Sequence, residues 1–377
     1  MTNIYSTIQK PTMLLDEVVT KNNIKTVAQK ALDGNVLLRP HFKTHQSAAI
    51  GEWFREFNIN AITVSSVDMA VYFAQYGWDD ITIAFPVNLL QLDSINQLAD
   101  KIDLGLLVES QEIVKKLAQG LEHPVNIWIK IDSGSHRTGL AWQDVDAIKN
   151  LVDIINADPN LKLKGLLTHA GITYHVDSPA TIKQCYQESI DHMCFIRDEL
   201  KKAGSQSLKI SVGDTPGTML SESLGDVDEI RPGNFVLFDA MQLSFGSCTA
   251  KDIAMVVACP IVAKQPQRSE IIIYGGAIHL SKDTFTENGI NKYGLVCQLH
   301  DQGWSSPIPG AYVRGLSQEH GMLYLPEEEF DKFNTGDCLG IIPAHSCLVV
   351  DLLQEYLTLT GKVIPTVNSE ISKSGLI

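Results

Sequence analysis

The chain has 377 residues, of which 44% are hydrophobic and 20% are charged, so it can form two domains or one large barrel with an attachment. The net charge of −14 leaves no basic excess, which argues against a general nucleic-acid or anionic-membrane surface. No apolar stretch reaches the roughly 18 residues that a membrane-spanning helix needs, so no membrane segment is expected.

The N-terminal residues and the cysteines both bear on where in the cell the protein is found. Residues 1–10 lack the basic-then-apolar layout of a signal peptide. The seven cysteines are odd in number and scattered, and no two of them form a Cys-x-x-Cys motif. Reduced thiols, and therefore a cytoplasmic protein, are expected.

Between about residues 35 and 240, short apolar runs typical of β-strands alternate with amphipathic helical stretches. Strands are predicted at 36–39, 61–65, 81–85, 104–108, 125–131, 163–168, 208–212 and 230–238. Helices are predicted at 67–76, 89–99, 111–118, 145–155 and 180–203. Apolar strands alternating with helices indicate a parallel sheet buried on both faces. Eight strands favour an α/β fold of the closed (β/α)8 TIM-barrel type, with an open doubly wound sheet as the alternative.

After about residue 246 the long helical periods disappear. Apolar runs at 254–262, 270–274, 295–299, 311–313 and 338–342 are separated by turns rich in Gly, Pro, Ser and Asp. This pattern predicts a mostly antiparallel β domain. We therefore expect a barrel over residues 1–245 and a β domain over residues 246–377, with the first residues packing against the β domain.

The segment His41–Ser47 lies where the first predicted barrel strand ends and a helix begins. A buried lysine at this position has a lowered pKa and a free amine, which can form a Schiff base. Lys43 is therefore a candidate catalytic residue. A solvated loop lysine is the alternative.

Other polar residues follow later strands, and in a barrel such strand ends form the active site. Gly213–Gly217 is a small-residue turn that enters a predicted helix at Thr218, so its N–H groups can bind a phosphate. Arg231–Asn234 can add further donors. An ordinary turn is the alternative in each case.

Two more side chains suit an aromatic ligand. Arg137 can hold a phenolate or carboxylate oxygen, or it can form a structural pair with Asp132. His169 can pack flat on a ring, or it can be a core histidine. A lysine, an arginine, a histidine and a phosphate cradle together match what pyridoxal 5′-phosphate requires.

With these motifs, the chain resembles the fold type III pyridoxal-phosphate enzymes, the alanine-racemase-like barrels, and more narrowly the D-threonine aldolase / D-serine dehydratase family. The lysine motif is similar over Arg39–His45, and it is the most specific one. The other similar segments are Pro11–Asp16, Asp132–Gly139, Thr168–Gly171, Asp214–Gly217, Glu229–Asp239, Gln318–Gly321 and His345–Cys347.

The resemblance implies roles for individual residues. Lys43 holds the cofactor as a Schiff base and, once displaced, acts as general base for the α-proton. The implied cofactor-binding residues are Lys43, Arg137, His169, Tyr174, Gly213, Asp214, Thr215, Arg231, Gly233 and Asn234. The partners implied are a small D-amino-acid substrate and a second subunit in a homodimer.

His345 and Cys347 are the candidate metal ligands. On an extended strand, residues two apart share a face, and imidazole with thiolate suits zinc. Two protein ligands leave positions open for water or substrate, as a Lewis-acid role requires. The sequence departs from the family at Ile172, where a second histidine is frequent, and at Ala344 and Leu348, which flank the metal pair.

The favoured function is a D-serine dehydratase-like lyase that converts small D-3-hydroxy amino acids to a 2-oxo acid and ammonia. A D-threonine aldolase, which gives glycine and an aldehyde, shares nearly all of these motifs. An amino-acid racemase is a further alternative, since it needs a second base such as Tyr274, Tyr293 or Tyr312. A non-catalytic cofactor carrier and a metal hydrolase using His41 and His45 complete the alternatives.

Overall fold

The computed structural model describes residues 7–176 and 178–374, so part of the N-terminal segment discussed above lies outside the described residues. The described chain divides into two compact units. Residues 26–43 and 54–233 form the first, which we call the barrel unit. Residues up to 25, 44–53 and 234 onwards form the second, which we call the β unit.

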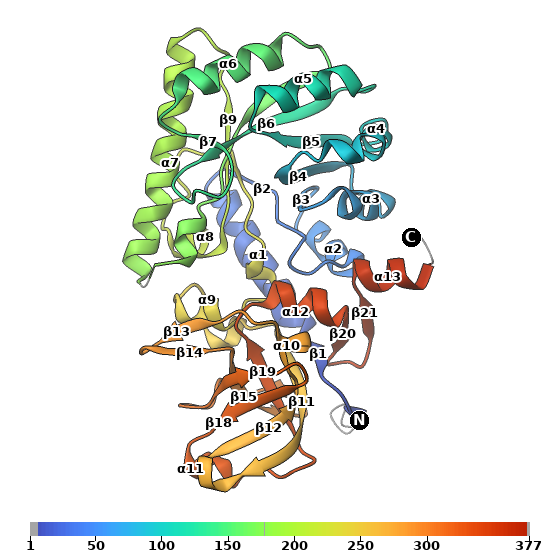
Figure 1. The fold of residues 1–377 in the computed structure, drawn as a ribbon, viewed down its shortest axis with the longest axis vertical. Coiled ribbons are helices and arrows are strands. Elements are labelled where there is room, and N and C mark those ends of the chain that lie inside the picture. Colours follow the sequence, from blue (N-terminus) through green and yellow to red (C-terminus); the bar gives the residue numbers. More distant parts are fainter. Residues whose placement is uncertain (1–6, 177, 375–377) are drawn as a thin grey trace. The chain divides into compact units, whose positions relative to one another are not determined.

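The barrel unit is built on parallel strands (Figure 1). In order around the sheet they are β2 (Leu37–Leu38), β10 (Glu229–Ile230), β9 (Lys209–Val212), β8 (Leu161–Leu167), β6 (Val125–Asp132), β5 (Asp103–Val108), β4 (Asp80–Pro86) and β3 (Ala61–Val64). A short strand β7 (Leu140–Ala141) pairs with β6.

Backbone contacts beyond β2 close this sheet on itself. His41 forms a parallel bridge with Thr63 of β3, and the N–H of Phe42 donates to the carbonyl of Thr63 at 2.8 Å. The first and last strands of the sheet are therefore joined, and the predicted (β/α)8 TIM-type barrel is confirmed.

Helices connect the strands and cover the outside of the sheet, as the predicted alternation requires (Figure 1). They are α3 (Val67–Gln75), α4 (Leu92–Ala99), α5 (Gln111–Gly120), α6 (Val145–Asn156), α7 (Pro179–Lys202) and α8 (Thr215–Leu220). Helices α1 (Glu17–Asp33) and α2 (Ala48–Arg55) each contain residues of both units. The N-caps of α3, α5 and α7 are serines whose hydroxyls accept from the backbone N–H three residues on. Strand β6 is buried along nearly its whole length, because helices cover one face and the barrel interior the other.

The last predicted strand, 230–238, is wrong in its extent. Strand β10 ends at Ile230, and residues Asn234–Val236 form a 3-10 turn instead. Pro232 has no N–H to donate to a neighbouring strand, and Phe238 has a φ of 52°, which an extended strand excludes.

The β unit contains an antiparallel sheet whose strands form a closed ring. In order, the ring consists of β12 (Glu270–Tyr274), β18 (His320–Tyr324), β17 (Tyr312–Leu316), β15 (Gly294–His300), β19 (Cys338–Pro343) and β11 (Met255–Gln265), which pairs back to β12. Strands β1 (Thr12–Leu15), β20 (Glu355–Thr358) and β21 (Val363–Pro365) extend it from β11, and β16 (Gly303–Trp304) pairs with β15. A separate hairpin joins β13 (Phe285–Glu287) to β14 (Ile290–Lys292). The predicted antiparallel β domain is confirmed.

The β unit also contains helices that the loss of long helical periods did not predict. They are α9 (Ala240–Ser244), α10 (Ala277–Leu280), α11 (Glu327–Phe330), α12 (Ser346–Leu353) and α13 (Val367–Ser374). Each has eight residues or fewer, so each spans too few turns to produce a clear period in the sequence.

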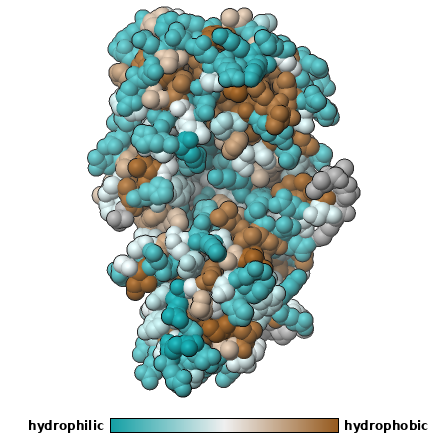
Figure 2. Space-filling model, in the orientation of Figure 1, coloured by the Kyte–Doolittle hydropathy of each residue, from teal (hydrophilic) through white to brown (hydrophobic). Residues whose placement is uncertain are grey.

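The visible surface is mostly hydrophilic, with apolar patches in both units (Figure 2). Among the exposed apolar side chains are Phe85 near the end of β4, Leu90 in the 3-10 turn Leu89–Gln91, and Leu348 and Leu352 on α12. None of the helices in the described part of the chain combines the length and the apolar character needed to cross a bilayer.

Candidate active site

Lys43 lies in a turn just after β2, and the residue before it holds the turn in place. Phe42 is fully buried, and its ring lies 4.9 Å from those of Phe54 and Phe73 and 5.0 Å from that of Trp78. Lys43 itself is exposed. The expectation of a buried lysine is therefore wrong for the protein chain alone, because the turn buries the phenylalanine and presents the lysine.

His169 follows β8 and is held by one hydrogen bond. Its Nδ1 lies 2.5 Å from the carbonyl oxygen of Gly213, which can only accept, so Nδ1 carries the proton. Burial lowers the pKa of His169 to about 3, against the opposing effect of the Gly213 bond and with help from the positive charges of Lys43, Arg137 and Arg231. The imidazole is therefore neutral at pH 7.

The same positive charges act on a second histidine. Burial, followed by the charges of Lys43 and Arg231, lowers the pKa of His41 well below its ordinary value. Arg137 contributes to this shift as well. Lys43, Arg137 and Arg231 come from separate loops of the barrel unit, yet all three influence both histidines, so they converge on one region that attracts anions.

Tyr174 and the turn after β9 lie beside His169. Tyr174 belongs to the 3-10 turn Gly171–Tyr174, and its ring centroid lies 6.0 Å from that of His169. Its hydroxyl oxygen accepts from the N–H of Thr215 at 3.4 Å. The Thr215 hydroxyl is buried and has no hydrogen-bond partner among residues 7–176 and 178–374, so it can serve a phosphate oxygen.

Gly213 allows this turn to lie close to the segment that follows β10. A Cβ atom at Gly213 would lie 2.9 Å from the backbone carbon of Arg231, so no larger residue fits there without a shift of backbone. Helix α8 begins at Thr215, three residues before the predicted start. The N–H groups that are candidates for binding a phosphate therefore lie at the N-terminus of α8 itself.

Asp214 is the N-cap of α8. Its Oδ1 accepts from the N–H of Gly217 at 2.5 Å and from the hydroxyl of Thr173 at 3.1 Å. Burial raises the pKa of Asp214 to about 7, although these two hydrogen bonds and Arg231 oppose the rise. The carboxyl is thus half protonated near neutral pH.

Arg231 is buried inside the barrel unit and directed by two bonds. One guanidinium nitrogen donates to the hydroxyl of Ser211, and the other donates to the carbonyl of Thr168 at 2.5 Å. Gly233 follows in a loop in which Pro232 accepts from the N–H of His41 at 2.9 Å. The loop after β10 is thereby tied to the lysine turn.

Arg137 is exposed and is not locked by the carboxylate that precedes it. Asp132 instead accepts from the N–H groups of Gly134 and His136 at 2.9 and 3.0 Å and faces the His136 ring at 3.1 Å. The alternative of a structural Asp132–Arg137 pair is therefore not supported, and Arg137 is available to a ligand.

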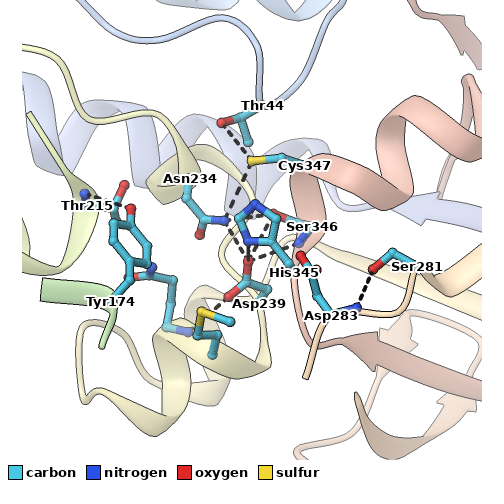
Figure 3. Close-up of polar contacts among 12 residues, drawn as sticks. Thr44, Tyr174, Thr215, Asn234, Asp239, Ser281, Asp283, His345, Ser346 and Cys347 are labelled. Atoms are coloured by element: carbon cyan, nitrogen blue, oxygen red, sulfur yellow. Dashed lines mark hydrogen bonds and ion pairs between the residues drawn. The ribbon is translucent and has the colours of Figure 1, made fainter. Parts of the chain in front are cut away.

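The remaining predicted residues, Asn234, His345 and Cys347, form a cluster in the β unit (Figure 3). Its centre is Asp239, which is fully buried. Oδ2 of Asp239 accepts from Asn234 at 2.6 Å and from the N–H of Ser346 at 3.0 Å, and it lies 3.4 Å from Nδ1 of His345.

Cys347 completes the cluster. Its Sγ lies 3.3 Å from the hydroxyl oxygen of Thr44, the residue that follows Lys43 in the chain. Burial alone would lower the pKa of His345, but the neighbouring Cys347 and Asp239 together raise it well above its ordinary value.

The predicted geometry of the metal pair is wrong, although the two side chains do meet. His345 is the N-cap of α12 and Cys347 lies in the first turn of this helix, so they do not alternate along a strand. With one ring nitrogen of His345 facing Asp239, the other nitrogen and the Cys347 sulfur suit a soft divalent ion. No group of three or more His, Cys, Asp or Glu side chains arranged around a metal position is found within the described residues.

Three further residues of these clusters escaped the sequence reasoning. Asp239 and Ser346 orient His345 and Asn234. Only the fold could reveal this, because Asp239 and Ser346 are 107 residues apart in the chain. Lys130 is buried on β6, where burial and then Arg231 and Arg137 lower its pKa to about 8. A charge inside the apolar run 125–131 is the signal that could have found Lys130.

Comparison with known proteins places the chain in a family. Residues 16–240 match the family described as "Alanine racemase, N-terminal domain", and residues 254–359 match the family described as "Putative serine dehydratase domain". The D-threo-3-hydroxyaspartate dehydratase of Delftia sp. strain HT23 is 30% identical, over 90% of this chain and 91% of that protein. Its solved structure has a TM-score of 0.87 and covers 96% of this chain and 98% of that one.

Two other relatives cover the same length. The D-serine dehydratase of Dictyostelium discoideum is 28% identical over 93% of each chain. The 3-hydroxy-D-aspartate aldolase of Paracoccus denitrificans is 25% identical over 96% of this chain and 91% of the relative. A further solved structure, of a D-threo-3-hydroxyaspartate dehydratase with one cysteine changed to alanine, is described as the metal-free form. The lysine turn, the neutral histidine, the buried arginine and these matches together show that the chain belongs to the family of alanine-racemase-type barrels that carry a C-terminal serine dehydratase domain.

Proposed function

We propose that this protein is a pyridoxal-phosphate-dependent lyase that converts a small D-3-hydroxy amino acid into a 2-oxo acid and ammonia by elimination of water. The observation that carries the proposal is the convergence of Lys43, Arg137 and Arg231 around the neutral His169. Two relatives that match over 90% or more of this chain are a D-threo-3-hydroxyaspartate dehydratase and a D-serine dehydratase, which supports dehydration as the reaction.

The barrel unit suits the cofactor residue by residue. The accessible amine of Lys43 is proposed to bind the cofactor aldehyde, and the neutral imidazole of His169 to pack on the ring. Arg231 faces the ring and Arg137 the phenolate oxygen in this assignment, since both are cationic donors. Tyr174, Gly213, Asp214, Thr215 and Gly233 are proposed to hold the phosphate end, and the Thr215 hydroxyl supports this because it has no hydrogen-bond partner among the described residues. Asn234, proposed for the same end, is the first residue of the β-unit segment that follows, and its amide donates to Asp239 of that unit.

When bound, pyridoxal phosphate supplies an electron sink for the negative charge that develops at Cα. The chain itself supplies the proton transfer. Lys43, once its amine is released by the substrate amine, takes the α-proton, and its ammonium form can then return a proton. His169 keeps its ring uncharged while this happens, because its pKa is lowered to about 3.

A metal is proposed at His345 and Cys347, most simply zinc. It would supply a Lewis acid that makes the substrate hydroxyl a better leaving group. Asp239 holds the other nitrogen of His345 and so fixes which nitrogen is free. The chelating chemistry of the pair supports this assignment, as does the metal-free form described for a cysteine-to-alanine variant of a D-threo-3-hydroxyaspartate dehydratase.

Aldol cleavage is the second candidate, because one full-length relative is a 3-hydroxy-D-aspartate aldolase. In that case the substrate hydroxyl loses its proton and the Cα–Cβ bond breaks, giving glycine and an aldehyde. A racemase has no use for a metal pair, so the pairing of His345 with Cys347 argues against it.

The test is a product assay. Purified protein with pyridoxal phosphate and zinc is given D-serine, D-threo-3-hydroxyaspartate or D-threonine, and 2-oxo acid, ammonia and glycine are measured. We expect equal amounts of 2-oxo acid and ammonia, and none from Lys43→Ala protein. Glycine with an aldehyde would make the protein an aldolase, and racemised substrate without either product would overturn the lyase.

We also propose three further properties that the sequence leads us to expect. They are the domain division into residues 1–245 and 246–377, a homodimer, and a cytoplasmic location. The homodimer rests on the family, and the location rests on the scattered cysteines. Size-exclusion chromatography with light scattering tests the homodimer.

A further inference from the structure

The interior of the barrel unit contains a row of charged and polar side chains. Parallel barrels of this type are normally filled by layers of Val, Ile and Leu. Here Arg39, Ser211, Glu229 and Arg231 are all buried, with 6%, 0%, 3% and 5% of their surface exposed. Ser211 lies on β9 and Glu229 on β10, while Arg39 and Arg231 directly follow β2 and β10. These strands are neighbours, because Glu229 lies opposite Ser211 on one side and Leu37 on the other.

Arg39 binds two carboxylates. Its Nε donates to Oε2 of Glu229 at 2.6 Å, and its two terminal nitrogens donate to the carboxylate oxygens of Asp80 at 2.5 and 3.2 Å. Arg39 therefore keeps one partner if Glu229 loses its charge. This end of the row is a buried ion-pair network.

Ser211 connects Glu229 to Arg231. Its hydroxyl donates to Oε1 of Glu229 at 2.5 Å, because a carboxylate can only accept. The same oxygen accepts from a terminal nitrogen of Arg231. A second nitrogen of Arg231 donates to the carbonyl of Thr168 at 2.5 Å. Two acceptors fix the guanidinium plane, and one of them is linked to the carboxylate.

Such an arrangement is poorly explained by stability. Removing buried charges from water costs free energy, and apolar side chains of similar volume are often as stable or more stable. An orienting role explains it better. The carboxylate of Glu229 compensates the charge of Arg231, which burial disfavours: burial lowers the pKa of Arg231, the charge of Glu229 opposes the fall, and the net pKa is about 10.

We propose that Glu229 and Ser211 are positioning residues that hold the guanidinium of Arg231 charged and at a fixed angle to the cofactor ring. This inference rests on the proposed function, because it requires a cofactor ring at Arg231. An arginine side chain has only donors, so a ring nitrogen that faces it must accept and stay unprotonated. Loosening Arg231 should therefore make that nitrogen easier to protonate.

The experiment compares Ser211→Ala with wild-type holoenzyme in the absence of substrate. The absorbance of the bound cofactor is followed from pH 5 to pH 10. The dissociation constant of the cofactor is measured by dilution. In Ser211→Ala, Arg39 keeps Glu229 and Asp80, so only the link to Arg231 is broken. We expect the midpoint of the spectral change to rise by about one pH unit and the dissociation constant to rise about tenfold, because a weakened hydrogen bond from a charged group costs on the order of one pKa unit.

Three variants separate positioning from structure. Ser211→Thr keeps the hydroxyl and should restore the wild-type midpoint. Glu229→Gln keeps the volume but removes the charge and should shift the midpoint in the same direction as Ser211→Ala, which keeps the test open if the alanine variant does not fold. Thr82→Ala, a buried hydroxyl on β4, is the matched control and should leave the spectrum unchanged.

The outcomes are distinct. A raised midpoint in Ser211→Ala and Glu229→Gln with rescue by Ser211→Thr supports positioning of Arg231. A wild-type midpoint in both loss variants, with only a lower melting temperature, overturns the inference and leaves the proposed function standing. Wild-type protein that binds no pyridoxal phosphate overturns both.

Discussion

At the scale of single residues, the surroundings of each titratable group decide its role more than its identity does. His169 stays neutral because it is buried among the positive charges of Lys43, Arg137 and Arg231. Asp214 is shifted in the direction opposite to most carboxylates, because burial disfavours its charged form. The lowered pKa of His169 suits packing on a cofactor ring. The raised pKa of Asp214 makes the stability of the protein depend on pH, which can be measured.

We predict that Asp214 makes the apoprotein less stable as pH rises. The pKa of its carboxyl is raised from 3.8 to about 7 in the folded protein, so the folded state holds the proton more tightly than the unfolded state. The stabilisation is complete below pH 3.8 and is lost as the pH rises through about 7. A shift of about three units corresponds to at most about 4 kcal/mol.

Asp214→Asn should remove this pH dependence, because an amide resembles the protonated carboxyl and its oxygen still accepts from Gly217 and Thr173. Urea unfolding of both proteins at pH 5 and pH 8 provides the measurement. The free energy of unfolding of the variant minus that of wild type should be larger at pH 8 than at pH 5. An equal difference at both pH values would contradict the prediction.

At the scale of elements, the position of the lysine turn depends on the residue before it. The aromatic rings around Phe42 belong to α2, α3 and the loop before β4, and the bridge from His41 to Thr63 joins this turn to β3. Packing of one side chain thus supports both the closure of the barrel and the exposure of Lys43.

We predict that Phe42→Ala lowers the free energy of unfolding by about 3–5 kcal/mol, the usual loss for a fully buried aromatic residue. It should also reduce cofactor incorporation, because the turn that carries Lys43 loses its anchor. Urea unfolding and absorbance of bound cofactor measure the two effects. The control is Phe195→Ala, whose ring is 45% exposed and whose loss should cost less than about 1 kcal/mol. Equal losses in the two variants would count against the anchoring role.

At the scale of the whole molecule, the candidate residues fall into two sets. Lys43, Arg137, His169 and Arg231 belong to the barrel unit, whereas Asn234, His345 and Cys347 belong to the β unit. Each set has its own hydrogen-bond network within its unit. Cofactor binding and metal binding should therefore be separable.

We predict that EDTA abolishes formation of 2-oxo acid while the bound cofactor keeps its absorbance. Cys347→Ala should reproduce this result without a chelator, because it removes one of the two proposed ligands. Zinc content by atomic absorption and cofactor content by spectrum are the measurements. Loss of the cofactor together with the metal would refute the separation, and full turnover in EDTA would exclude a metal role.

The sequence by itself determined the barrel, the β domain and the lysine motif. Apolar runs and helical periods depend on residues near each other in the chain, so they predict strands and helices such as β6 and α7 without a structure. The same local patterns gave wrong predictions for the strand over 230–238 and for an extended segment at His345–Cys347. In both places the chain turns within two or three residues.

Only the tertiary structure decided which side chains meet. Asp239 reaches Ser346 across 107 residues and Arg39 reaches Glu229 across 190, and no local pattern contains such pairs. The exposure of Lys43 also depended on the fold, because the aromatic residues that bury Phe42 come from later segments. Burial, and with it the pKa of each buried group, is a property of packing between distant segments, and for this reason the sequence named the candidate residues but could not assign their charge states or partners.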